Sequence, residues 1–311
     1  MSAEAVSGRP PTPDRANLWL SALACALSLW QYFAVPLLIA GNGLVWAWTL
    51  LPGVLLTNGY WALIHEGIHH RLHSNSRVSD AVGRVLCILY GSPMRLLRCG
   101  HLLHHRYNRT EFEQPEVFEA GGNRWAARFS YYFTLTGGLY VMELASTLLA
   151  FLPRRALLEL AARLDAPRRL NATAIRTASG LRELGQVRLD AALSLLLVGA
   201  AFWCYGQNWW VLAMALWGRG FLISTWDQMF HYDTPYDRPR SGYDAQAPRW
   251  LAAVSLNFLF HGTHHAQPDL PWNALPAASG ARRESWSKLY RHQFKGPVYR
   301  GSISSDRPPN R

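Results

Sequence analysis

Long apolar stretches joined by short polar turns occur twice along the chain. They are Leu18–Ala40 and Leu44–Ile64, joined by Gly-Asn-Gly, and Leu189–Tyr205 and Trp209–Trp226, joined by Gly-Gln-Asn. A helix needs about 20 mainly apolar residues to cross the roughly 30 Å of hydrocarbon in a bilayer. Because a short turn joins antiparallel neighbours, each pair predicts a transmembrane helical hairpin. The pattern therefore predicts an all-α integral membrane protein with two hairpins, or about four spans.

A fifth apolar stretch, Phe129–Leu152, is also long enough to span, but both of its flanks are rich in arginine. Positive residues concentrate in the short loops on the cytoplasmic side, so residues 65–128 and 153–188 both belong there. A stretch with both ends on one side does not cross. We therefore expect a re-entrant or interfacial helix, bent near Gly137–Gly138. Glu143 within it would be costly against lipid, which favours burial against protein.

The same orientation assigns the termini and the large loops to the cytoplasm. Residues 1–17 are polar and proline-rich, do not resemble a cleavable signal peptide, and predict a disordered cytoplasmic tail. Residues 18–276 predict one membrane domain, whose histidine-rich cytoplasmic loops form a helical cap. Residues 277–311 predict a cytoplasmic C-terminal tail. We expect a multi-pass protein with its active site on the cytoplasmic side.

The composition agrees with a membrane protein. Hydrophobic residues make up 50% of the chain and charged residues 16%, against roughly 25% in soluble globular proteins. The net charge is +11, but its arginines lie between apolar stretches and no nucleic-acid-binding motif occurs, so anionic lipid or an acidic protein is the expected partner. The four cysteines form no CxxC pair, which argues against a disulfide framework or a thiolate metal site.

The histidines carry the candidate chemistry. All but one of the 12 fall in four places, and only His292 lies outside them. Residues three and four apart share a helix face, so each cluster can aim two or three imidazoles at one point. The four places contain His65, His69, His70 and His73; His101, His104 and His105; His231; and His261, His264 and His265.

Convergent imidazoles predict metal binding. A single histidine is usually a satisfied core residue, but several clusters on the same predicted face of the membrane are hard to explain by packing. Neutral imidazole is the commonest metal ligand and suits iron, zinc and copper. Some nine ligands exceed the roughly four that one zinc ion takes, so the count predicts two metals. The spacing alone does not identify the metal.

The order of these motifs resembles the membrane fatty acid desaturase and hydroxylase superfamily. The chain presents HxxxH, HxxHH, an isolated histidine and HxxHH, with paired spans between the second and third, followed by "HHAQPDLPWNALP". The similarity covers roughly residues 18–276. It implies a non-haem di-iron site that activates O2 and attacks an unactivated C–H bond of a lipid. By matching motifs, the implied ligands are His65, His69, His101, His104, His105, His231, His261, His264 and His265.

Some positions near these motifs stay open. His70 is an alternative ligand to His69, and His73 is expected behind the ligands or facing solvent. Family members often have asparagine where this chain has Asp227, so this carboxylate either adds negative charge near one iron or bonds a histidine behind the ligands. Glu66 and Glu116 are candidates to orient a ligand ring.

Arg219 is an unusual charge within an apolar stretch. It is expected to pair with Glu143, to reach the cytoplasmic edge, or to contact a polar substrate head.

The resemblance favours a fatty acyl desaturase. Hydroxylation, ketolation of a carotenoid ring and oxidative decarboxylation are alternatives on the same scaffold, because small changes in how the chain lies alter the outcome. A membrane metal transporter is a further possibility from a different class. The chain lacks a cytochrome b5 motif, a Rossmann fingerprint and iron–sulfur cysteine spacings. A ferredoxin or another small acidic carrier is therefore the expected electron donor.

Overall fold

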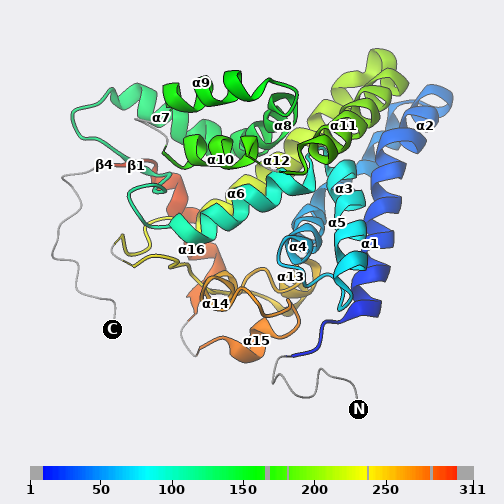
Figure 1. The fold of residues 1–311 in the computed structure, drawn as a ribbon. Coiled ribbons are helices and arrows are strands. Elements are labelled where there is room, and N and C mark those ends of the chain that lie inside the picture. Colours follow the sequence, from blue (N-terminus) through cyan, green and yellow to red (C-terminus); the bar gives the residue numbers. More distant parts are fainter. Residues whose placement is uncertain (1–9, 165–168, 181, 237, 281–282, 300–311) are drawn as a thin grey trace.

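The computed structural model describes residues 10–164, 169–180, 182–236, 238–280 and 283–299, which are mainly helical (Figure 1). The first helical segment, Asp14–Asn42, consists of α1 (Asp14–Leu29), a π-helical stretch at Trp30–Ala34 and α2 (Val35–Asn42). It is long and apolar enough to cross a membrane, as predicted for Leu18–Ala40. The helix begins inside the predicted N-terminal tail, and residues 1–9 of that tail lie outside the described residues.

The second predicted span is interrupted. Three shorter helices replace the continuous helix expected over Leu44–Ile64: a 3₁₀ helix at Leu44–Leu50, α3 (Leu51–Leu55) and α4 (Thr57–Ile68). Pro52 lies in the first turn of α3, where its missing N–H is tolerated, and Leu56 leaves helical geometry between α3 and α4. Hydropathy did not reveal these breaks because the stretch as a whole remains apolar, although Thr57 and Asn58 follow Leu56 directly.

The second long apolar segment, Leu184–His231, contains α11 (Leu184–Tyr205), a 3₁₀ turn (Gly206–Asn208) and α12 (Trp209–His231). The chain turns at Gly206, whose φ of 51° favours glycine, and α11 and α12 contact each other. This matches the predicted hairpin, with α12 extending beyond Trp226 to His231. Among the described residues, two segments are long and apolar enough to span, and the number of crossings stays a prediction.

Two further helices support the site. α5 (Ser76–Tyr90) is capped by Asn75, whose side-chain oxygen accepts from the backbone N–H of Arg77 at 2.9 Å. It ends at Gly91, with φ of 109°, and α6 (Met94–Tyr107) follows. α5 packs against α1, α4 and α11, so it holds the apolar helices together next to α6.

The fifth apolar stretch is bent at the predicted place. α7 (Arg124–Phe133) and α8 (Leu139–Leu149) are joined by Thr134–Gly138, where Gly137 has φ of 123°. Glu143 on α8 faces protein, since its carboxylate accepts a hydrogen bond from the Tyr90 hydroxyl at 2.6 Å. Whether this bent pair re-enters the membrane or lies on it stays a prediction.

The arginine-rich segment after α8 is more ordered than a loop. It forms α9 (Arg154–Leu164) and α10 (Arg169–Ser179), which pack against each other, and α10 also packs against α6 (Figure 1).

The C-terminal region wraps around the end of α12. Residues 283–299 of the predicted tail belong to the fold, since Leu289 is buried in the main core and the Tyr131 hydroxyl donates to the Gln293 carbonyl at 2.6 Å. Two short parallel strand pairs, β1–β4 and β2–β3, fasten this region. The helices are α13 (Arg249–Val254), α14 (His261–Ala266), α15 (Leu275–Ala278), α16 (Trp286–His292) and a 3₁₀ turn (Gln293–Lys295); the strands are β1 (Val117–Phe118), β2 (Ala245–Gln246), β3 (Glu284–Ser285) and β4 (Val298–Tyr299).

Arg219 is buried among aromatic rings. Its guanidinium lies 5.3 Å from the centroid of the Tyr60 ring and 5.6 Å from that of Tyr90, and its Nε donates to the Thr57 hydroxyl at 3.3 Å. No ion pair joins Arg219 to Glu143 in the described part of the chain. Tyrosine rings, and not the expected carboxylate, therefore stabilise this charge.

A buried ion pair ties α5 to α11. Arg84 binds both carboxylate oxygens of Asp190, at 2.6 and 3.2 Å, and the Asp190 side chain is fully buried. Removing the cation should leave an uncompensated charge, so Arg84→Ala is expected to lower the free energy of unfolding by about 3 kcal/mol. Arg155→Ala, which breaks an exposed pair with Glu159, should change it by less than about 0.5 kcal/mol. Denaturant unfolding in detergent measures both, and equal losses would contradict the assignment.

Candidate metal centre

Four helices deliver the histidines to one region. His65 lies in the last turn of α4 and His69 directly follows that helix, whereas His101, His104 and His105 lie on α6. The other four come from the last residue of α12, His231, and from the short helix α14. The predicted histidines, which are far apart in sequence, therefore meet in space.

The nine rings fall into two groups. Within each group, the candidate ligand nitrogens all lie within 4.8 Å of one another. Nε2–Nε2 distances between neighbouring rings are 2.9 to 3.0 Å in the larger group and 2.9 to 3.3 Å in the smaller. The first group contains His65, His69, His101, His105 and His264, and the second contains His104, His231, His261 and His265.

The grouping follows a spacing of four residues. His65 pairs with His69, His101 with His105, and His261 with His265. His104 and His264, which were expected to share a point with the rest of their clusters, instead join the opposite group. Consecutive helical residues diverge by about 100°, so only residues four apart point in nearly the same direction.

The two groups fit metal ions held by neutral imidazole. Two nitrogens bound at about 2.1 Å and at right angles lie about 3.0 Å apart, close to the separations observed. The His65 Nε2 is buried and has no hydrogen-bond partner, which is costly unless it binds a cation. Burial lowers the pKa of His69 to about 4 and that of His105 to about 2, so both rings are neutral at pH 7.

Two of the rings are oriented by partners that the sequence did not reveal. His104 Nδ1 lies 2.7 Å from the Glu113 carboxylate, and His231 Nδ1 lies 3.1 Å from the Asn108 amide nitrogen and 3.4 Å from the Ser241 carbonyl. Donation from the His104 Nδ1–H to Glu113 leaves the Nε2 of that ring free to bind a metal. The sequence offered only a weak signal for Glu113, a carboxylate shortly after the second cluster.

Glu66 and Glu116, the expected orienting carboxylates, bind other groups: Glu66 accepts from the Trp272 N–H, and Glu116 pairs with Arg109.

The remaining candidates lie outside both groups. His70 has φ of 56° and its ring faces Asp80 at 3.3 Å, while His73 lies near Asp14 at 3.5 Å. Asp227 is one helical turn before His231 and faces a cavity next to the groups.

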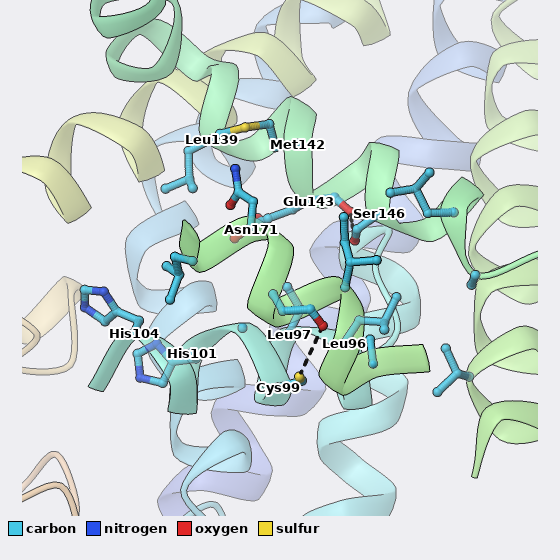
Figure 2. A pocket seen from close by; sticks show the side chains of 18 of the residues that line it. Leu96, Leu97, Cys99, His101, His104, Leu139, Met142, Glu143, Ser146 and Asn171 are labelled. Carbon is cyan, nitrogen blue, oxygen red and sulfur yellow. Dashed lines mark hydrogen bonds between the residues drawn. The ribbon is translucent and has the colours of Figure 1, made fainter. Parts of the chain in front are cut away.

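The cavity has a volume of about 290 Å³ and lies along α6, between α8 and α10 (Figure 2). His101 and His104 line it, and they belong to different histidine groups. Its wall extends along α6 to Leu96, about 12 Å from His104 at 1.5 Å per residue. Most lining side chains are apolar, so the cavity suits an extended hydrocarbon that reaches both groups.

One wall of the cavity comes from the arginine-rich segment. Asn171, Ala174, Ile175 and Ala178 line it from α10. Their spacing of three and four residues places them on one helix face. This periodicity was present in the sequence but was concealed by the arginines around it.

Two histidine groups beside an apolar cavity, in a largely helical chain with two long apolar segments, define a candidate metal centre that an extended hydrocarbon can reach. The chain belongs to the fatty acid desaturase family, because the family model "Fatty acid desaturase" matches residues 41–297. It is also similar to a β-carotene ketolase from Paracoccus sp. (strain N81106), with 23% identity over 266 residues, covering 83% of this chain and 86% of the ketolase. Both relationships indicate an oxidoreductase of the desaturase and hydroxylase type.

The cavity wall on α10 generates a test of hydrocarbon binding. Ala174→Phe should project a ring into the cavity and weaken the binding of tritiated hexadecane about tenfold, since even one methylene changes the affinity of an apolar pocket measurably. Thr177→Phe, on the exposed face of the same helix, should leave it unchanged. Equilibrium binding to the detergent-solubilised protein distinguishes the two. Similar affinities for both variants would argue against this cavity as the binding site.

Proposed function

We propose that the two histidine groups hold two iron ions, and that the protein uses O2 to introduce a double bond into a fatty acyl chain. The observation that carries this proposal is the position of His101 and His104, which belong to different groups and line the same apolar cavity. A hydrocarbon in that cavity would lie against both metals. When bound, the irons would activate O2 to remove hydrogen from an unactivated C–H bond.

The chain's own residues prepare this chemistry. All nine grouped histidines would serve as ligands, with Glu113 fixing the orientation of the His104 ring. Apolar side chains along α6, α8 and α10 would hold the substrate and exclude water from the reacting carbon.

Asp227 would add negative charge beside the smaller group. It lies among the cavity-lining residues with His104, and no hydrogen bond joins it to an imidazole in the described residues. This supports the electrostatic role over a hydrogen bond to a histidine behind the ligands.

Ketolation of a carotenoid ring is a second candidate, because the similar β-carotene ketolase aligns over 86% of its own length. Hydroxylation and oxidative decarboxylation would use the same site and differ from desaturation in the step after hydrogen removal. A metal transporter is less well supported, since the cavity that reaches the histidines is mainly apolar and offers no hydrated path for ions.

The proposed reaction needs electrons from another protein, and it needs the histidine groups to face the compartment that contains this donor. A ferredoxin or another small acidic protein would bind the arginine-rich surface by charge. The histidine groups would then face the cytoplasm, at the ends of the spans of a multi-pass protein.

Iron content tests the assignment of the ligands. Elemental analysis of the purified protein should give about two irons per chain, and His264→Ala should lower this to about one by removing a ligand of the larger group. His70→Ala is the matched control, because its ring lies outside both groups, and it should retain both irons. Exchangeable zinc in place of iron, or loss of iron in His70→Ala alone, would contradict the proposal.

Product analysis tests the reaction. Expression in a bacterial host with a ferredoxin and its reductase should yield acyl chains that have lost two hydrogens, detected by mass spectrometry. His261→Ala should abolish this product by removing a candidate ligand. A gain of oxygen in co-expressed β-carotene would favour the ketolase alternative, and neither product with a competent donor would refute lipid oxidation.

A further inference from the structure

Glu143 places a carboxylate within the wall of an otherwise apolar cavity. It projects from α8 near the middle of the cavity, with Ser146 one turn later on the same helix and Asn171 opposite on α10 (Figure 2). Burying a carboxylate among apolar groups is costly unless it is well hydrogen-bonded. The proposed oxidation does not require this polar group.

Only part of the hydrogen-bonding capacity of Glu143 is used inside the protein. Its Oε2 accepts from the Tyr90 hydroxyl at 2.6 Å, and this internal bond fixes the side chain on α8. A carboxylate accepts up to about four hydrogen bonds. Ser146 donates to the Glu143 backbone carbonyl at 2.6 Å, which leaves its oxygen free to accept. The site can therefore receive donor groups from a bound molecule.

The charges around the cavity limit what that molecule can be. Glu113, Glu143 and Asp227 line the cavity, and none of the described lining residues is lysine or arginine. A free carboxylate or phosphate beside Glu143 would therefore have no cationic side chain to pair with among the described lining residues. A neutral group that donates a hydrogen bond to Glu143 fits this position better than an anion does.

We infer that the cavity binds a neutral hydrocarbon carrying a hydroxyl group, and that Glu143 accepts the hydrogen bond of this hydroxyl. The inference rests on the proposed function and deepens it by naming a substrate class. The hydrocarbon portion extends from Glu143 towards His101 and His104, so the hydroxyl determines which carbon lies beside the histidine groups. Glu143 is thus a positioning and specificity residue.

Binding of matched probes tests this inference on the full-length, iron-containing protein in detergent. The probes are methyl stearate, a set of methyl hydroxystearates with the hydroxyl at successive positions, and free stearate. The best hydroxy ester should bind about tenfold more tightly than methyl stearate, the gain expected from one additional hydrogen bond. Free stearate should bind most weakly. Equal affinity for every ester, or tightest binding of stearate, would overturn the inference without any variant.

Variants separate ligand binding from a structural role. Glu143→Leu should abolish the preference for the hydroxy ester, whereas Glu143→Gln, which still offers an acceptor oxygen, should retain most of it. Tyr90→Phe removes the internal hydrogen bond but keeps the carboxylate, so it should also retain the preference. A preference that persists in Glu143→Leu, or that disappears in Tyr90→Phe alone, would assign Glu143 to the fold.

Oxidation assays on the same preparations distinguish this inference from the proposed function. A hydroxyl preference without any oxidised product would support the binding role and refute the oxidase. Oxidation without such a preference would support the oxidase and refute the role of Glu143.

Discussion

The convergence of nine largely buried imidazole rings is the constraint on which the rest of the structure depends. Burial favours the neutral form of most of the rings, although Glu113 outweighs burial and raises the pKa of His104. Neighbouring ring nitrogens lie about 3 Å apart, as two ligands of one metal ion would. The helices that supply them must therefore end or pass within a small volume. The partly irregular C-terminal region meets this requirement by bringing α14 to the histidines of α4, α6 and α12. The backbone N–H of Ala245 helps to hold it there by donating to the Leu259 carbonyl at 2.8 Å.

α6 links this centre to the rest of the molecule. One helix supplies rings to both groups and also forms the floor of the cavity, so the position of a bound hydrocarbon and the position of the ligands are mechanically coupled. α4 and α5 pack against α6 on one side, while α8 and α10 line the cavity on the other. An interior organised in this way lets apolar and charged groups adjoin without exposing either to water.

The sequence was most informative where structure follows from a local pattern of residues, and least informative where it depends on contacts with residues far away in the chain. The apolar stretches over Leu18–Ala40 and Leu189–Trp226 and the bend at Gly137 were predictable, because helix length, turn glycine and hydropathy are local. The breaks around Pro52 and Leu56 were missed, because hydropathy averaged over the stretch outweighed the local proline and polar residues there. Two other features could not be predicted from residue spacing. The tyrosine rings around Arg219 come from residues distant in the sequence, and the Glu113 carboxylate that contacts His104 comes from a loop.

The sequence by itself determined the chemistry of the centre: which imidazoles exist, which lie four residues apart, and which apolar stretches are long enough to cross a membrane. Only the tertiary structure decided how the rings are divided. His104 and His105 are adjacent in the chain, yet they join different groups because a helix turns by about 100° per residue and opposite sides of α6 face different partners. The same fold decided that an arginine-rich segment would form the wall of a hydrocarbon cavity, since only packing against α6 reveals its inner face.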